Sequence, residues 1–145
     1  MQKQSKVLFV GPTGTGKTCL VKKLCTNLFE QKYIQTLSFE VYTNIGEYCI
    51  FDTGGKENYR GLVDGIYMNS DIGIIFLDNV ENNTSLFYWI EEIEKFLPKN
   101  KIGIVITKCK EYKEEVFLDF PIIYLDIKSL ESKNFLKFLD KIKNK

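Results

Sequence analysis

Residues 11–18 read Gly11-Pro12-Thr13-Gly14-Thr15-Gly16-Lys17-Thr18, between the apolar run Val7-Leu8-Phe9-Val10 and an amphipathic run. The pattern GxxxxGK[ST] between a strand and a helix is typical of a phosphate-binding loop. Its glycines let the backbone wrap so that several N–H groups point into one concavity, beside the positive N-terminal end of the helix. The plainer alternative is a glycine-rich turn with a chance lysine, and the flanking strand and helix disfavour it.

Side chains at the end of this loop carry the chemistry. Lys17 supplies a positive charge to the β- and γ-phosphates, and the Thr18 hydroxyl is placed for Mg²⁺. A second polar loop has the pattern Asp52-x-x-Gly55. Its carboxylate can hold the Mg²⁺ shell and its glycine N–H can meet a γ-phosphate, while a Thr36 hydroxyl could complete the metal shell. The γ-phosphate would order both loops, and its loss would release them.

Composition bounds the class of protein. The chain has 145 residues, which suit one domain (1–145), and a net charge of +1, which gives no general case for binding nucleic acid. Four scattered cysteines without a CxxC pair predict reduced thiols, in the cytoplasm, the nucleus or both. No apolar run could span a membrane, and neither Gln2 nor Lys145 fits a lipidation motif, so we expect no membrane anchor.

Hydrophobic periodicity predicts the remaining elements. Strands are expected at residues 6–10, 39–43, 47–51, 72–77, 102–106 and 122–125, with a turn at Asn44-Ile45-Gly46. Helices are expected after the phosphate-binding loop (Leu20, Leu24, Leu28), over 86–97 up to Pro98, and over 135–142. Residues 29–38 lack a period and are expected to form a loop over the phosphate site, and 108–121 has room for a turn or two of helix.

The order of these elements predicts the fold class. Unbroken apolar runs at 72–77, 102–106 and 122–125 are typical of strands covered on both faces. Strands that alternate with helices predict a doubly wound α/β domain, a mostly parallel sheet with one antiparallel hairpin strand. Ligands of such sheets bind beyond the carboxyl ends of the strands, which is where both polar loops fall.

The two loops together resemble those of the Ras superfamily of small GTPases, most closely its Ran branch of nuclear-transport GTPases. The likeness is carried by residues 29–37 (Phe-Glu-Gln-Lys-Tyr-Ile-Gln-Thr-Leu), by 52–57 (Asp-Thr-Gly-Gly-Lys-Glu), and by Gly61-Leu62, Asp64-Gly65 and Tyr67. It covers essentially the whole chain and is strongest over residues 6–78. It implies a P-loop NTPase with the small-GTPase (G-domain) fold, with GTP or GDP and Mg²⁺ as ligands.

The resemblance also implies residue roles. The nucleotide-binding residues would be Thr13, Gly14, Thr15, Gly16, Lys17, Thr18, Cys19, Phe29, Tyr33, Thr36, Gly55, Lys108, Lys110, Ile127 and Lys128. The Mg²⁺ ligands would be Thr18, Thr36 and Asp52, and the catalytic positions would be Gly55 and Lys56. The Phe29 ring would flank the base and Tyr33 would lie over the phosphates; the alternative for both rings is simple packing.

Two departures from the family concern hydrolysis. Lys56 stands where the family has a glutamine that orients the attacking water, and an ammonium group cannot accept a proton from water. Thr13 stands where the family usually has a glycine, and its side chain would crowd an incoming arginine finger. Both changes predict slow hydrolysis.

Two further departures concern the base. The guanine-reading motif Asn-Lys-x-Asp appears as Thr107-Lys108-Cys109-Lys110, and a lysine offers only donors where the family's aspartate accepts two hydrogen bonds. Such a mismatch costs on the order of 10⁴-fold in discrimination. Glu111 could restore the contact if the loop shifts. The family's Ser-Ala-Lys loop appears as Asp126-Ile127-Lys128, which keeps the lysine and lacks the serine.

Three functions remain open. The first is a Ran-like, GTP-binding molecular switch with poor hydrolysis. The second is a pseudo-GTPase interaction module that mimics Ran and binds nucleotide weakly, or a base other than guanine. An ATP-using kinase is weaker, because the Asp-x-x-Gly hairpin and the lack of an arginine-rich lid argue against it. By resemblance, a monomer would contact nuclear-transport receptors or Ran regulators from Thr36 to Val41 and from Lys56 to Tyr67.

Overall fold

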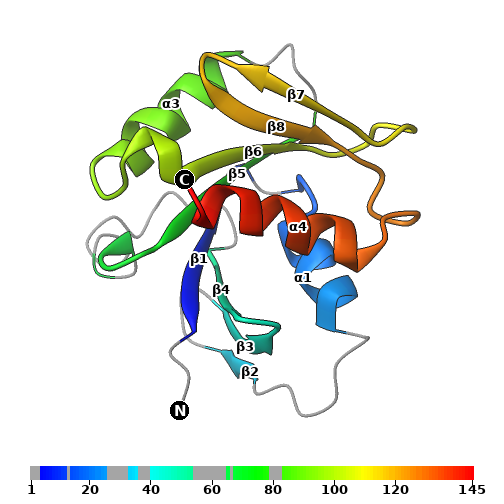
Figure 1. Ribbon diagram of the computed structural model, residues 1–145, viewed down its shortest axis with the longest axis horizontal. Coiled ribbons are helices and arrows are strands. Elements are labelled where there is room, and N and C mark those ends of the chain that lie inside the picture. Colours follow the sequence, from blue (N-terminus) through cyan, green and yellow to red (C-terminus); the bar gives the residue numbers. More distant parts are fainter. Residues whose placement is uncertain are drawn as a thin grey trace.

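A computed structural model describes residues 4–12, 14–25, 33–35, 40–53, 65, 67–78 and 83–145. Its centre is an eight-stranded sheet with the order β2-β3-β4-β1-β5-β6-β8-β7 (Figure 1). The strands are β1 (Ser5–Val10), β2 (Tyr33–Gln35), β3 (Glu40–Ile45), β4 (Tyr48–Asp52), β5 (Ile72–Leu77), β6 (Ile102–Ile106), β7 (Lys113–Phe117) and β8 (Phe120–Tyr124). The helices are α1 (Lys17–Cys25), α3 (Asn83–Glu94), α4 (Ser132–Lys143) and the short 3₁₀ helix η1 (Lys99–Lys101).

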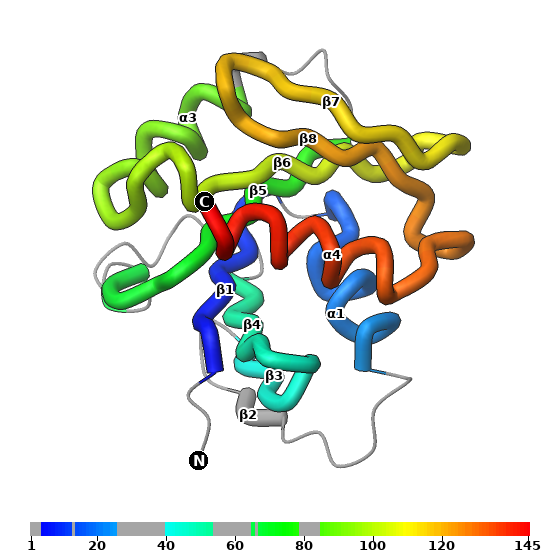
Figure 2. Tube along the Cα trace, in the orientation of Figure 1, coloured from blue at the N-terminus to red at the C-terminus, as the bar shows by residue number. Residues whose placement is uncertain are grey.

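The middle of the sheet is parallel and its two edges are antiparallel. Strand β1 pairs in parallel with β4 and β5, and the parallel ladder continues through β6 to β8. Antiparallel pairs join β2 to β3, β3 to β4, and β7 to β8. The strand order places β2 and β7 at opposite edges, and Figure 2 shows β7 beside β8 at one of them. The doubly wound α/β class and the predicted hairpin are therefore confirmed.

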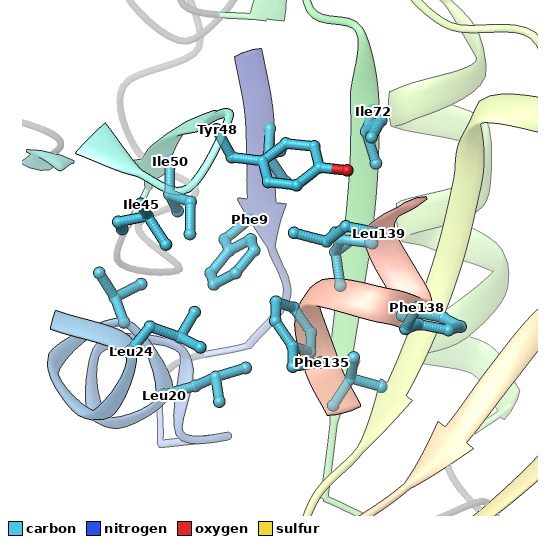
Figure 3. Close-up of a cluster of buried hydrophobic side chains, with 14 of the residues drawn as sticks. Phe9, Leu20, Leu24, Ile45, Tyr48, Ile50, Ile72, Phe135, Phe138 and Leu139 are labelled. Carbon is cyan, nitrogen blue, oxygen red and sulfur yellow. The ribbon is translucent and has the colours of Figure 1, made fainter. Parts of the chain in front are cut away.

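Helices cover both faces because the central strands are apolar on both faces. Along β1, Val7 and Phe9 point to the core under α1 and α4, whereas Leu8 and Val10 point to the core under α3. Figure 3 shows the first core, where the rings of Phe9 and Phe135 pack edge to face with their centres 5.9 Å apart. Burial of each such side chain contributes about 1.5–3 kcal/mol.

Helix α4 follows from its apolar spacing and from a cap supplied by a neighbour. Its buried residues recur at steps of three and four and are Phe135, Phe138, Leu139 and Ile142. Its last carbonyl groups lack partners within the helix, and the Lys101 ammonium donates to that of Lys143 at 2.7 Å and to that of Lys145, just beyond the helix, at 2.9 Å. Among the described residues, no helix has the length and apolarity needed to cross a membrane.

The structure corrects three local predictions. Residues 33–35, expected in a loop, form β2 and pair with β3. The turn of the β3–β4 hairpin begins at Gly46, because β3 continues through Ile45. Residues 113–117, expected to hold at most a turn or two of helix, form β7, because Leu118 and Asp119 adopt positive φ angles of 50° and 69°. Two consecutive residues of that kind make the tight turn that fits a β-hairpin.

Candidate phosphate-binding site

The predicted site residues gather at one edge of the sheet because the central strands run parallel. The phosphate-binding loop follows β1, Asp52 ends β4, Thr107 follows β6, and residues 126–128 follow β8. The register aligns Phe9 with Asp52, and Ile106 with Tyr124, so the carboxyl ends of β1 and β4 lie level with each other, as do those of β6 and β8. This edge is where open α/β sheets bind ligands.

The loop backbone has the conformation that a phosphate cradle needs. Gly11, Gly14 and Gly16 have φ angles of 135°, 86° and 93°, which only glycine adopts at little cost. A Cβ atom on Gly11 would lie 2.3 Å from the carbonyl oxygen of Phe76 in β5, so the loop starts in direct contact with the sheet. The Thr15 hydroxyl donates to the Pro12 carbonyl at 2.8 Å and closes the loop.

Lys17 is a buried cation at the centre of the loop. Its side chain is 4% exposed, and its ammonium donates to the carbonyl oxygens of Gly11 and Pro12 at 2.6 and 2.8 Å. Burial lowers the pKa of Lys17 to about 8, and the charge of Asp52 opposes that shift. Buried charges are costly without a counter-charge, so an anionic phosphate in the loop would stabilise this lysine.

Thr18 and Asp52 meet as the predicted metal ligands should. The Thr18 hydroxyl donates to the Asp52 carboxylate at 2.5 Å, and Asp52 is 2% exposed. Thr53 holds the backbone beside Asp52, because its hydroxyl and N–H both donate to the Phe9 carbonyl, at 2.9 and 3.3 Å. A hydroxyl and a carboxylate are the hard oxygen ligands that Mg²⁺ prefers, so these two residues fit that ion.

Thr107 joins the loop of residues 107–110, called the base-side loop below, to the phosphate-binding loop. Its hydroxyl is buried and donates to the Thr15 carbonyl at 2.8 Å, and its N–H donates to the Leu77 carbonyl at 2.8 Å. Lys108 follows with a φ angle of 62° and lies 3.5 Å from the Asp78 carboxylate. Lys110 is exposed. The loop is therefore fixed at Thr107, and its reading position faces solvent.

Residues 126–128 pack against the same loop from the other side. A Cβ atom on Gly16 would lie 2.5 Å from Cδ1 of Ile127, so Ile127 contacts the phosphate-binding loop directly. The Lys23 ammonium, on α1, donates to the carbonyl oxygens of Ile127 and Lys128 at 2.6 and 2.7 Å. No motif in the sequence marks Lys23 or Asp78, because a single charged residue beyond a motif has no characteristic spacing.

The described residues therefore bring together much of the predicted site. They are Gly14, Thr15, Gly16, Lys17, Thr18, Asp52, Lys108, Ile127 and Lys128, with Cys19 exposed in the first turn of α1 and Lys110 at the rim. Thr13, Phe29, Thr36, Gly55 and Lys56 lie outside the described residues, and Tyr33 is described only as part of β2. Their predicted roles stay predictions.

Comparison with known families now adds to this geometry. A family model described as Roc, the Ras of Complex domain of DAPkinase, matches residues 6–110, which run from β1 through the base-side loop. The chain belongs to the Roc family. Domains of this Ras-like GTPase class bind guanine nucleotide, usually with Mg²⁺, and act as nucleotide-dependent switches, which is the coarse function of this Roc domain.

A solved structure agrees with this Roc assignment at the level of the fold. It is the Arl6 (BBS3) small GTPase from Trypanosoma brucei with the bound nucleotide analogue GppNp. The likeness covers 98% of each chain with a TM-score of 0.64 and 18% sequence identity, so it shows the small-GTPase fold alone. Neither comparison distinguishes the Ran branch from the rest of the superfamily.

Proposed function

We propose that this Roc domain is a nucleotide switch with slow hydrolysis and a weak preference for guanine. The observation that carries the switch is the convergence of the buried Lys17 ammonium with the Thr18–Asp52 pair at one edge of the sheet. A buried cation beside two hard oxygen ligands suits a triphosphate with its Mg²⁺.

The weak guanine preference rests on Lys110. Thr107 still anchors the base-side loop to Thr15, so the loop keeps its place while its reading residue has changed from an acceptor to a donor. A lysine facing the donor edge of guanine leaves both partners unsatisfied. A base that offers hydrogen-bond acceptors to Lys110 would lose less binding free energy. We therefore expect the site to bind other nucleotides nearly as well as GTP.

Slow hydrolysis rests on sequence alone. Lys56 replaces the water-orienting glutamine, and Thr13 adds a side chain where the family usually has a glycine. In single-turnover measurements, Lys56→Gln should raise the rate of hydrolysis if the site is otherwise competent. A flat response would point to Thr13 or to an activator that supplies a missing group.

The Ran-like character and its partners are a finer part of the same proposal. They rest on the sequence likeness at residues 29–37 and 52–67, and they imply nuclear-transport receptors or Ran regulators as partners, in the cytoplasm or nucleus. The two proposed contact segments end at Val41 and Tyr67, which are 9% and 2% exposed. Contacts with a partner would therefore come from the residues that precede these two in each segment.

The experiment that tests the switch is the identification of bound nucleotide. The protein is purified in Mg²⁺ and denatured, and the released nucleotide is identified by ion-exchange chromatography. We expect a nucleoside di- or triphosphate close to one per protein, and none from Lys17→Ala. A Lys17→Ala variant that retains the nucleotide would refute the phosphate-binding role of the loop.

The second candidate, a pseudo-GTPase that serves as an interaction module, is favoured by the simultaneous changes at Lys56 and Lys110. In that case the wild-type protein would be purified with an empty site. Added nucleotide would then bind weakly and without regard to its base.

A further inference from the structure

Strand β7 is an edge strand with an unusual concentration of exposed apolar side chains. Of the five large hydrophobic residues that are exposed in the described part of the chain, three lie at this hairpin: Tyr112, Val116 and Leu118, at 41%, 73% and 55%. Their even spacing places the first two on one face of the strand. Exposed edges of this kind are templates for pairing with another strand.

The hairpin turn determines which backbone groups of β7 face outward. A two-residue turn at Leu118 and Asp119 makes Phe117 and Phe120 a hydrogen-bonded pair, because such turns close with one. Hydrogen-bonded pairs then recur at every second residue. The N–H and C=O groups of residues 113, 115 and 117 therefore face β8, and those of residues 112, 114 and 116 face away from it.

A proline in β8 supports this assignment independently. Pro121 lies opposite Val116 and has no N–H to donate. A proline fits only where the pair exchanges no hydrogen bonds, which is the position that the turn gives to Val116 and Pro121. In the described part of the chain β7 has β8 as its only strand partner, so the outward row lies along the end of the sheet.

The charges along β7 are self-complementary. Lys113 and Glu115 lie on one face, 3.0 Å apart, with Lys113 over the Tyr124 ring. Glu114 lies on the other face, where the Lys141 ammonium of α4 donates to both of its carboxylate oxygens at 3.1 and 3.2 Å. The strand thus carries one plus–minus pair, which lies beside Tyr124, and one acidic group that Lys141 of α4 neutralises.

We propose that β7 pairs antiparallel with β7 of a second copy of this chain, about a two-fold axis at Glu114. In this register each Lys113 faces Glu115 of the other copy, and each Tyr112 faces Val116 of the other copy. The outward groups of residues 112, 114 and 116 become the hydrogen-bonded pairs, as antiparallel pairing requires. The two Glu114 side chains meet at the axis, each beside its own Lys141.

The neighbouring register is less favourable. A shift of the axis to Glu115 also pairs the outward backbone groups with one another. It would place the two Glu115 carboxylates directly opposite each other and would set each Lys113 against Phe117 of the other copy. The axis at Glu114 also brings two carboxylates together, but each lies beside its own Lys141, and only this axis forms two Lys113–Glu115 pairs between the copies. Opposite charges that face each other stabilise a strand pair, so the charge pattern favours the axis at Glu114.

A charge-swap experiment tests this pairing in the full chain. Sedimentation equilibrium would measure the self-association of wild type, Lys113→Glu and Glu115→Lys, each alone and as an equal mixture of the two variants. We expect wild type to dimerise with a dissociation constant of about 100 μM or less, as a small interface would. Each variant alone should associate at least tenfold more weakly, and the mixture should recover the association because its two strands are again complementary.

Two substitutions of exposed apolar residues, one in β7 and one in α3, distinguish this interface from nonspecific hydrophobic association. Val116→Asp should weaken dimerisation at least tenfold, whereas Phe87→Asp, at an exposed position of α3, should leave it unchanged. Circular dichroism would confirm that all variants are folded. A wild-type protein that stays monomeric, as its sequence led us to expect, would overturn the proposal. So would a dimer that survives Lys113→Glu and Glu115→Lys unchanged.

Discussion

At the residue scale, Gly11 lies directly against the backbone of β5. Gly11→Ala would place a Cβ atom on the backbone of β5 and would also force an L-residue to a φ angle of 135°. We expect it to lower the free energy of unfolding by about 3 kcal/mol or more, by strain and overpacking together. Gly46→Ala is the control, because it has a φ angle of 58° and open space around it, and should cost about 1 kcal/mol. Urea unfolding of both variants would contradict the account if their costs were equal.

Lys110 is the residue on which base selectivity depends. Lys110→Asp would restore an acceptor at the reading position, so the affinity for GTP should rise at least about tenfold relative to ATP. The control is Glu111→Gln, which should leave both affinities unchanged. If Glu111→Gln instead removes GTP binding, Glu111 reads the base and the role given to Lys110 is wrong.

At the scale of elements, Lys23 joins α1 to the loop of residues 126–128. Lys23→Ala would remove two charge-assisted hydrogen bonds to the carbonyl oxygens of that loop. We expect nucleotide affinity to fall about tenfold, because the loop of residues 126–128 loses its support, as with other residues that orient a site from behind. Lys22→Ala, at the neighbouring exposed position, should have no effect in the same titration.

The opposite end of the sheet has a tie of its own, between the β3–β4 hairpin and α4. The Tyr48 hydroxyl donates to the Asp140 carboxylate, and Lys143 lies 2.9 Å from Glu47. A cleft of about 420 Å³ lies there, lined by these residues and by Leu136. Tyr48→Phe should lower the free energy of unfolding by about 1.5–3 kcal/mol, as loss of a hydrogen bond to a charged group does.

That tie also predicts a dependence on pH. Burial, and then the bond to Asp140, raise the pKa of Tyr48 above its usual value near 10. Above pH 10 the unfolded chain loses this proton while the folded chain keeps it, so stability falls as pH rises. Tyr48→Phe should reduce that slope between pH 9 and 11. An unchanged slope in urea unfolding would show that Tyr48 does not titrate differently in the two states.

At the scale of the whole molecule, strands with unbroken apolar runs could be predicted from the sequence, whereas a strand that depends on pairing with a neighbour could not. The apolar runs at 72–77 and 102–106 are strands because both faces are covered, so hydrophobicity alone revealed β5 and β6. Strand β7 has a charged and largely exposed sequence, and only its turn and its pairing with β8 make it a strand.

The same contrast holds for the site. The meeting of Thr18 with Asp52 could be predicted because the patterns GxxxxGK[ST] and Asp-x-x-Gly mark both positions. The contacts of Lys23 and of Ile127 join residues about a hundred positions apart, and no local pattern in the sequence encodes them.

We propose above that this edge of the sheet binds a nucleoside triphosphate through Lys17, with little regard to the base. A calorimetric titration of nucleotide-free protein with GTP, GDP, ATP and XTP in Mg²⁺, with Lys17→Ala beside it, tests this directly. We expect one-to-one binding, with triphosphate affinities within about tenfold of one another because Lys110 cannot read guanine. No binding of any nucleotide by wild type, or equal binding by Lys17→Ala, would contradict the account.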